Sequence, residues 1–209
     1  MSDIFTIDTV QQAFGQPNEI NYTNQKDGFT VELPSGLKPS AFHFGDFMKQ
    51  IPNPVVLEIG CDMGYSTKFL LDSNPSLILY GIDPYDDYVD WNGNTLTRRQ
   101  EMYQIVMDKF KSYGDRFKLI RMGSDEAVSM FEDNFFDLIF IDGLHTYDQV
   151  KKDCENYYSK CKDGAIFAGH DYNVIEGVNR AVKEFAEKIG KKQIMEGSED
   201  TWFWIKWYE

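Results

Sequence analysis

Acidic and histidine side chains follow two separate apolar runs of this sequence. Asp142 and His145 come shortly after one run, and His170 and Asp171 come shortly after the next. Carboxylates and imidazoles are the side chains that bind divalent cations and move protons near neutral pH. If the two runs are neighbouring parallel strands, their carboxyl ends bring all four side chains to one edge of a sheet.

Two interpretations of this cluster are open. In the functional one, Asp142, His170 and Asp171 hold a divalent cation, Mg²⁺ or Mn²⁺, and Asp142 and His145 are the catalytic residues. A metal lowers the pKa of an otherwise unreactive hydroxyl, and the imidazole of His145 then removes its proton. In the structural one, His145 and Thr146 cap the next helix, and Asp171 forms a turn.

A second segment that predicts ligand binding is the turn within residues 55–66. An apolar strand leads into Gly60, which permits a sharp turn and a close approach of the backbone to a ligand. A diphosphate-binding turn has a third glycine and favours anions, whereas this turn carries Glu58 and Asp62. The two acids favour a cationic ligand, such as the sulfonium of S-adenosylmethionine, over NAD.

The elements that must position these residues alternate along the chain. Short apolar runs predict buried parallel strands, and the longer stretches between them have helical spacing. Strands are expected at 54–59, 77–82, 117–122, 136–141 and 165–168, and helices at 65–72, 97–113, 125–131, 147–161 and 176–189. Two further strand-like runs, 192–195 and 201–208, are joined by a polar turn with Gly197 and predict an antiparallel hairpin. The expected fold is therefore α/β, a doubly wound and mostly parallel seven-stranded sheet with a C-terminal antiparallel hairpin.

Length and composition limit the class of protein. A chain of 209 residues fits one such domain, expected at 53–209, with residues 1–52 as an N-terminal extension that forms a substrate lid or a structural cap. The net charge of −13 disfavours nucleic acid and anionic membrane surfaces as partners. Three cysteines cannot all pair, the first ten residues lack a basic signal region, and no run is long enough to span a bilayer. We expect a cytoplasmic protein.

The segment Glu58–Gly64 resembles motif I of the class I S-adenosylmethionine-dependent methyltransferases, although Asp62 stands where that family usually has glycine. Tyr80-Gly81-Ile82-Asp83 resembles their second strand, which ends in an acid. The resemblance implies that Gly60 and Gly64 lie beside the methionine part of the cofactor, that Asp83 binds the ribose hydroxyls, and that 122–125 contact adenine. The expected cofactor-binding residues are Glu58, Gly60, Cys61, Asp62, Gly64, Tyr65, Ser66, Asp83, Ser124, Asp125 and Asp142.

The stretch Ile141–Tyr147 is similar to that of metal-dependent O-methyltransferases that act on sugar hydroxyls. The resemblance implies metal ligation by Asp142 and Asp171 and a base role for His145. His170 stands where relatives commonly have an acidic ligand, and an imidazole admits manganese or softer metals beside magnesium.

The segment 84–94 is rich in aromatic rings and carboxylates, as sugar-binding sites are, and predicts a small-molecule or glycan acceptor. A mobile acidic loop is the plain alternative. Two other functions stay open. One is a metal-independent methyltransferase for a phenol or amine, and the other is a non-catalytic S-adenosylmethionine-binding module, for example one domain of a larger glycan-building polypeptide.

Overall fold

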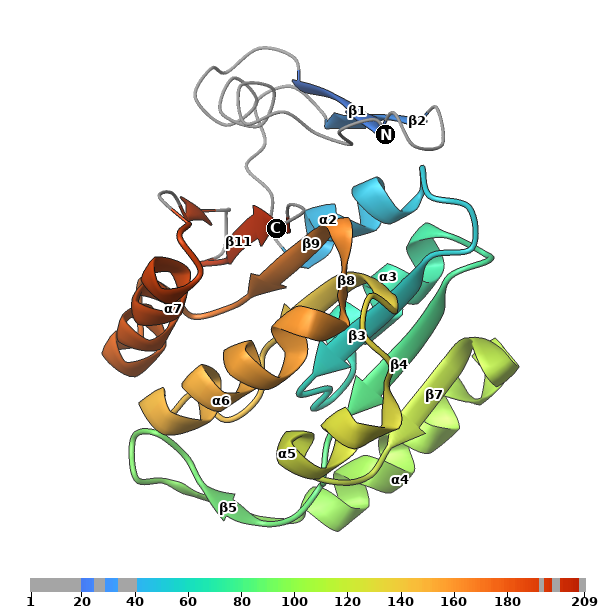
Figure 1. The fold of residues 1–209 in the computed structure, drawn as a ribbon. Helices are drawn as coiled ribbons and strands as arrows, with labels where there is room; N and C mark the ends of the chain where they lie inside the picture. The colour runs from blue at the N-terminus through green and yellow to red at the C-terminus, as the bar shows by residue number, and fades with distance from the viewer. Residues whose placement is uncertain (1–19, 25–28, 34–40, 192–193, 197–199, 207–209) are drawn as a thin grey trace.

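A computed structural model describes residues 20–24, 29–33, 41–191, 194–196 and 200–206. Its centre is a seven-stranded sheet of order β10-β11-β9-β8-β3-β4-β7 (Figure 1). The strands are β3 (Val55–Ile59), β4 (Ile78–Ile82), β7 (Phe117–Ile120), β8 (Phe136–Ile141), β9 (Cys161–Gly169), β10 (Met195–Glu196) and β11 (Trp202–Ile205). Six of them have four or more residues, and β10 has two.

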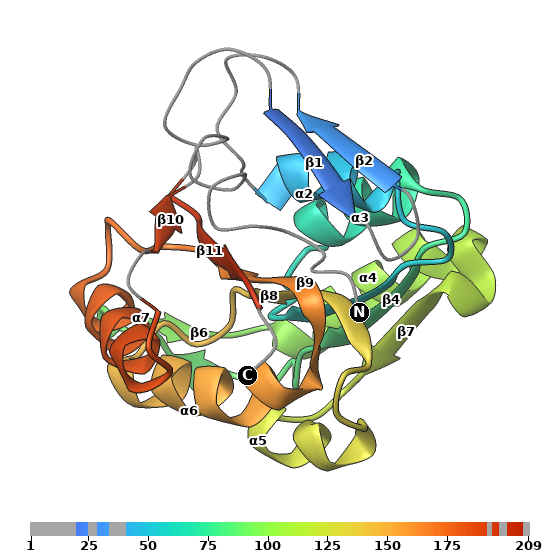
Figure 2. The same ribbon diagram turned by 45° about the horizontal axis from the view of Figure 1, so that its top comes forward.

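The five strands from β9 to β7 are parallel, while β11 is antiparallel to β9 and to β10. Figure 2 shows this terminal hairpin at the β9 edge of the sheet. The predicted doubly wound fold with a C-terminal antiparallel hairpin is confirmed.

Helices cover both faces of the sheet. They are α2 (Ala41–Met48), α3 (Tyr65–Ser73), α4 (Arg99–Phe110), α5 (Ser124–Ala127), α6 (Tyr147–Tyr157) and α7 (Glu176–Lys188). In Figure 1, α6 and α7 lie together in front of the sheet, and α2, α3 and α4 lie behind it. None of the helices in the described part of the chain is long and apolar enough to span a bilayer.

The last strand, β11, is buried along its whole length. Trp202, Phe203, Trp204 and Ile205 are all buried, because both sides of β11 are covered. The ring of Trp204 stacks on Phe185 of α7 at a centroid distance of 6.2 Å, and the ring of Phe203 lies 5.8 Å from Phe44 of α2. Both faces of this strand therefore belong to the core.

Three predicted helices are shorter than expected. The helix expected at 147–161 is α6, which ends at Tyr157 and is followed by the 3-10 turn Tyr158–Lys160. The helix expected at 97–113 is α4, and a 3-10 turn, Lys111–Arg116, follows it because Gly114 has non-helical angles (φ 56°, ψ −133°). The helix expected at 125–131 divides into α5 and the 3-10 turn Val128–Met130. All three changes lie in the helices and leave the carboxyl edge of the sheet as predicted.

The N-terminal extension is described only in part. Residues 1–19, 25–28 and 34–40 lie outside the described residues, and the strands β1 (Ile20–Asn24) and β2 (Phe29–Leu33) form a separate antiparallel pair. Phe44 and Met48 of α2 are buried in the core. The helix α2 of the extension is therefore part of the core. A substrate lid formed by the rest of the extension stays a prediction.

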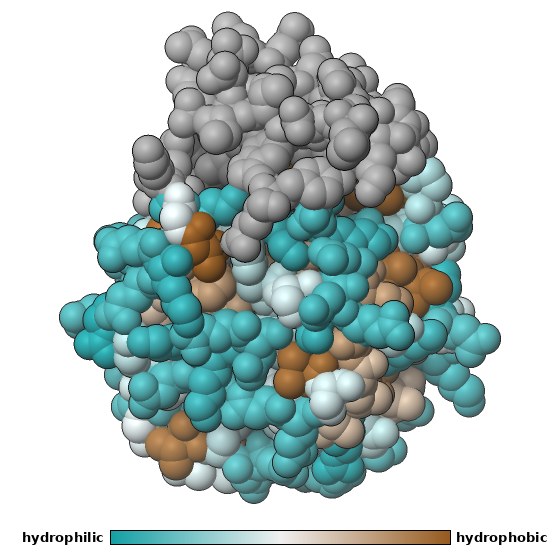
Figure 3. Space-filling view, viewed as in Figure 1, coloured by the Kyte–Doolittle hydropathy of each residue, from teal (hydrophilic) through white to brown (hydrophobic). Residues whose placement is uncertain are grey.

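The described part of one face of the molecule is mostly polar. Figure 3 shows a largely hydrophilic face with small, separate hydrophobic patches, in keeping with the net charge of −13. Cys61, Cys154 and Cys161 are buried and unpaired, as expected.

Candidate active site

The strand order reverses between β3 and β8. From β3 the chain winds outward through β4 to β7, then returns to β8 on the other side of β3. The ends of the two central strands are joined by a hydrogen bond from the Asp142 amide to the Ile59 carbonyl, 2.8 Å long. In open α/β sheets, this reversal point at the carboxyl edge is where ligands bind.

A cleft of about 910 Å³ opens at this edge. Its walls come from the ends of β3, β4, β7 and β8 and from the first turns of α4, α5 and α6. Seven acidic residues line it, against the two arginines Arg99 and Arg121: Asp62, Asp83, Asp86, Asp125, Glu126, Asp142 and Asp153. The cleft is therefore acidic, as the sequence of the turn after β3 predicts.

Glycine is required at two points of that turn. Gly60 has φ +89°, and a Cβ there would overlap the carbonyl oxygen of Asp142. Gly64 has φ +70°, and a Cβ there would overlap the ring of Phe110. Glycine thus lets the turn pack directly against the end of β8 and against α4.

Glu58 lies beneath the turn and does not line the cleft. Its side chain is fully buried and accepts hydrogen bonds from the hydroxyls of Ser66 and Thr67 in the first turn of α3. Burial raises the pKa of Glu58 to about 7, against the effect of these two hydrogen bonds. In this structure Glu58 positions the start of α3.

The predicted ribose acid, Asp83, lies at the end of β4 and lines the cleft. Its Oδ2 accepts the amides of Cys61 and Asp62 at 3.2 and 3.0 Å, and its Oδ1 accepts the amide of Tyr85 at 2.9 Å. Arg99 pairs with the same carboxylate at 3.2 Å and also with Asp62. Asp83 therefore fixes the turn after β3 and neutralises a buried guanidinium.

The remaining predicted residues of the turn lie outside the cleft wall. Cys61 is buried against Gly81 of β4. The Tyr65 side chain is 73% exposed, and the ammonium of Lys109 lies 4.9 Å from its ring centroid. Of the residues expected to bind cofactor, five line the cleft: Asp62, Asp83, Ser124, Asp125 and Asp142.

The end of the cleft at β7 and α6 carries a polar network. Ser124 donates to Asp153 Oδ1 at 2.6 Å, and the amide nitrogen of Gln149 lies 3.1 Å from the same oxygen. Tyr157 donates to the Ser124 carbonyl at 2.7 Å. Burial raises the pKa of Asp153 to about 6.

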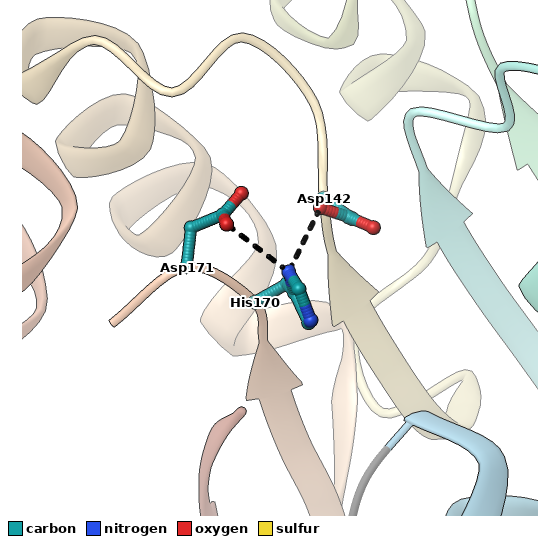
Figure 4. Close-up of side chains that lie close together, drawn as sticks. All are labelled: Asp142, His170 and Asp171. Carbon is teal, nitrogen blue, oxygen red and sulfur yellow. Dashed lines mark ion pairs between the residues drawn. The ribbon is translucent and has the colours of Figure 1, made fainter. Parts of the chain in front are cut away.

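The structure brings the four predicted acids and histidines together. Asp142 and His145 line the cleft, and His170 and Asp171 lie next to them, outside the lining residues. His145 Nε2 lies 3.2 Å from Asp142 Oδ1 and 3.1 Å from Asp171 Oδ2. His170 Nδ1 lies 3.3 Å from Asp171 Oδ1 and 3.9 Å from Asp142 Oδ1 (Figure 4). The predicted convergence of the β8 and β9 tips is thus observed.

The ionisation of this cluster reflects its charge pairing. Burial alone lowers the pKa of His145, but the carboxylates of Asp142 and Asp171 more than offset it, so the pKa lies above its ordinary value. Burial raises the pKa of Asp171, but the neighbouring His170 and His145 bring it below its ordinary value. The site stabilises a protonated imidazole beside two carboxylates.

Asp142, His170 and Asp171 also fit a divalent cation. One donor atom from each lies within 4.8 Å of the other two. Two ligands at roughly 2.1 Å from one ion are at most about 4.2 Å apart, so small side-chain movements close the set. Two carboxylates and an imidazole suit manganese as well as magnesium.

The structural interpretation holds in part: Thr146 caps the next helix, and Asp171 begins a turn in which its carbonyl accepts the amide of Ile175 at 3.1 Å. Thr146 is the N-cap of α6, and its side-chain oxygen accepts the amide of Gln149. His145 instead faces the two carboxylates, and Asp171 has φ +60° in the loop after β9. The helix cap and the acid–histidine cluster coexist in adjacent residues.

Among the residues that line the cleft, Arg99, Arg121, Gln149 and Asp153 were not included in the sequence interpretation. Gln149 and Asp153 had a signal in the sequence, because positions 145, 149 and 153 share one helical face. Arg99 had no such signal in the sequence, because its partners Asp62 and Asp83 lie 37 and 16 residues away along the chain.

An open sheet with this strand order, this hairpin and an acidic cleft at the reversal point defines the class I methyltransferase fold. A methyltransferase-domain family model matches residues 57–172, more than half of the chain. The chain belongs to that family, and the expected class of enzyme, an S-adenosylmethionine-dependent methyltransferase, is confirmed.

Solved structures agree in fold. The O-methyltransferase NovP superposes with a TM-score of 0.61 at 15% identity, over 78% of this chain and 75% of NovP. The O-methyltransferase from Bacillus cereus in complex with SAH superposes with a TM-score of 0.55 at 16% identity, over 81% and 82% of the two chains.

Two relatives match in sequence. Uncharacterized protein R132 of Acanthamoeba polyphaga mimivirus is 28% identical over 61% of this chain and 59% of its own length. Uncharacterized protein y4gI of Sinorhizobium fredii (strain NBRC 101917 / NGR234) is 35% identical over 37% of this chain and 8% of its own length. The chain thus spans less than two thirds of both relatives.

Proposed function

We propose that this methyltransferase transfers the methyl group to a hydroxyl oxygen of a sugar or glycan with the help of a divalent cation. The observation that carries the proposal is the convergence of Asp142, His170 and Asp171 beside His145 at the mouth of the cleft. The fold likeness to two O-methyltransferases, NovP and the Bacillus cereus enzyme, supports oxygen as the acceptor atom.

The cleft fits S-adenosylmethionine. The charged residues of its wall are mostly acidic, which favours a sulfonium cation over a diphosphate. Glycine at Gly60 lets the turn after β3 pack against the Asp142 backbone and so closes this side of the cleft. Asp83 would hold the ribose, and Ser124 and Asp125 would lie against the adenine.

His145 is the proposed base. A cation held by Asp142, His170 and Asp171 would supply Lewis acidity, which lowers the pKa of an acceptor hydroxyl. His145 takes the hydroxyl proton onto its imidazole, and the neighbouring carboxylates of Asp142 and Asp171 stabilise the imidazolium. The oxygen attacks the methyl carbon, the carbon–sulfur bond breaks, and the neutral thioether leaves. The His145 side chain is 24% exposed, so its proton can pass to water.

A sugar acceptor is supported by the segment that follows β4. Asp86 and Tyr88 line the cleft, and Trp91 is 48% exposed in the hairpin formed by β5 (Tyr88–Val89) and β6 (Thr95–Leu96). Aromatic rings stack on sugar faces, and carboxylates accept hydrogen bonds from hydroxyls.

One observation favours a metal-independent enzyme as a second candidate. Both carboxylates of the cluster already pair with His145 and His170, so their charge is compensated without a cation. Such an enzyme would act on a more acidic acceptor, such as a phenol, which needs less activation.

The experiment is a methyl-transfer assay with labelled S-adenosylmethionine against a panel of glycans, sugars and phenols, with and without EDTA. We expect transfer to a sugar hydroxyl, loss of turnover in EDTA, and its recovery with Mn²⁺ or Mg²⁺. His145→Ala is expected to lower turnover by about 10² to 10⁴-fold. Phenol methylation that EDTA leaves intact would replace this proposal with the metal-independent enzyme. Tight cofactor binding without transfer to any acceptor would point to a binding module within a longer protein.

A further inference from the structure

Asp153 lies at the end of the cleft farthest along α6 from the acid–histidine cluster. It shares one face of that helix with Gln149, one turn earlier. The residue is 1% exposed, yet it lines the cleft. A buried carboxylate without a cationic partner is costly, so its surroundings call for an explanation.

The two oxygens of Asp153 have different environments. Oδ1 accepts the hydroxyl of Ser124 at 2.6 Å and the side-chain amide of Gln149 at 3.1 Å. No residue in the described part of the chain donates a hydrogen bond to Oδ2. Because Asp153 lines the cleft, Oδ2 is the acceptor that it offers to a ligand.

Both oxygens of the neighbouring acid, Asp125, already have donors among the described residues. Its Oδ1 accepts the amides of Gln149 at 3.2 Å and Asn156 at 3.4 Å, and its Oδ2 pairs with Lys152 at 3.2 Å. Of the two acids that Gln149 contacts, only Asp153 keeps an oxygen for which the described residues supply no donor.

The proposed reaction would fix the direction of the cofactor in this cleft. Its methyl group would have to reach the acceptor hydroxyl beside His145, so its purine would extend away from His145, toward Ser124 and Asp153, which also line the cleft. An ionised carboxylate accepts hydrogen bonds and cannot donate them. Adenine presents an amino donor at its 6-position, whereas a 6-oxo purine presents an acceptor there.

We infer that Asp153 Oδ2 accepts a hydrogen bond from the 6-amino group of the cofactor's adenine and thereby selects 6-amino over 6-oxo purines. The inference rests on the use of S-adenosylmethionine in this cleft. It assigns the amino-group contact to Asp153 on α6, and leaves Asp125 as the partner of Lys152.

Asp153→Asn separates this role from a purely structural one. The introduced asparagine keeps an oxygen that accepts from Ser124 and Gln149, and these two donors hold that oxygen where Oδ1 lies now. The amide nitrogen then replaces Oδ2 and faces the cleft as a donor. A structural anchor would tolerate this change with no effect on purine preference, whereas a purine-reading residue would reverse its preference.

The test is calorimetric titration of the wild-type protein, Asp153→Asn and the control Asp133→Asn, an exposed acid outside the cleft, with S-adenosylhomocysteine and its 6-oxo analogue, S-inosylhomocysteine. We expect the wild type and Asp133→Asn to bind the amino compound at least about tenfold more tightly, because the oxo group leaves the carboxylate unpaired. Asp153→Asn is expected to lose this preference or to reverse it.

Three outcomes are distinguishable. Equal affinity of the wild type for both compounds overturns the inference. This comparison needs no variant, so the inference can be contradicted even if Asp153→Asn does not fold. An unchanged preference in a folded Asp153→Asn also overturns it. Failure of the wild type to bind either compound instead contradicts cofactor binding in this cleft, on which the proposed function depends.

Discussion

Arg99 Nη2 lies 3.2 Å from Asp83 Oδ2, and both side chains are more than nine-tenths buried. The rings of Tyr85 and Tyr88 lie 5.3 and 5.6 Å from the same guanidinium. Arg99 is thus a cation enclosed by acids and aromatic rings at the cofactor cleft. Arg99 compensates part of the negative charge of Asp62 and Asp83. Five further acids line the cleft and keep it acidic.

Removing Arg99 is expected to destabilise the fold. Arg99→Met leaves Asp83 buried without its cation, and we expect a loss of about 3 to 5 kcal/mol in the free energy of unfolding, measured by urea denaturation. Adding Asp83→Asn should recover part of that loss, because the neutral amide needs no cation. Arg98→Met removes an exposed arginine and serves as the control, with an expected change below about 0.5 kcal/mol. A loss in Arg99→Met no larger than in this control would contradict a stabilising pair.

Glu58 is expected to make stability depend on pH. Its pKa is about 7 in the folded protein against an ordinary value of 4.5, so between these values the folded state binds the extra proton. Stability therefore falls as pH rises from about 4.5 to about 7, by roughly 3 kcal/mol in total. Asp153, with a pKa of about 6, adds a slope of the same sign at lower pH.

Glu58→Gln should remove the Glu58 part of this slope. Urea denaturation at about pH 5 and about pH 8 is expected to show a smaller loss of stability in the variant than in the wild type. Glu101→Gln changes an exposed acid of α4 and is the control. An equal pH dependence in Glu58→Gln and the wild type would show that Glu58 is ionised in the folded protein throughout this range.

Asp200 is expected to position the proposed metal ligand Asp171. Its side chain accepts the amides of Asn173 at 2.6 Å and Val174 at 3.1 Å, and its carbonyl accepts the amide of Tyr172 at 3.1 Å. Asp200→Ala should loosen the loop after β9 and weaken Mn²⁺ binding by about tenfold or more, as outer-shell changes do.

Affinity for S-adenosylhomocysteine should stay unchanged in Asp200→Ala, because the cofactor cleft does not include this loop. Calorimetry with the ion and with the cofactor product measures both effects. Asp200→Asn keeps one acceptor and is expected to fall between the wild type and Asp200→Ala. An equal loss of both affinities would indicate general unfolding of the hairpin edge.

The sheet and the acid–histidine cluster could be predicted because they depend on local sequence. The apolar run at 136–141 is β8 with unchanged bounds, and parallel pairing of β8 with β9 brings Asp142 and Asp171 to one edge. The same periodicity cannot show what covers a strand. Burial of both sides of β11 depends on α2 and α7, which pack from distant parts of the chain.

The electrostatics of the cleft were less predictable than its composition. Acids in the turn after β3 are visible in the sequence, but their partner Arg99 lies at the start of α4, beyond the β5–β6 hairpin. Its position depends on how that connection folds back over Asp83. Local patterns thus indicate which charges a site holds, and tertiary packing decides which of them are compensated.

His170 is expected to set the metal preference in the proposed enzyme. The imidazole replaces a hard oxygen ligand by nitrogen, which favours Mn²⁺ over Mg²⁺, and His170→Asp should shift the preference toward Mg²⁺. Turnover and calorimetric affinity with each ion measure the shift, and both readouts are expected to move together. Asp133→Asn, which changes an exposed acid paired with Lys160 away from the cluster, should keep the wild-type preference. If His170→Asp keeps the wild-type order of Mn²⁺ and Mg²⁺ in both measurements, His170 is not a ligand, and Asp142 and Asp171 alone must hold the ion.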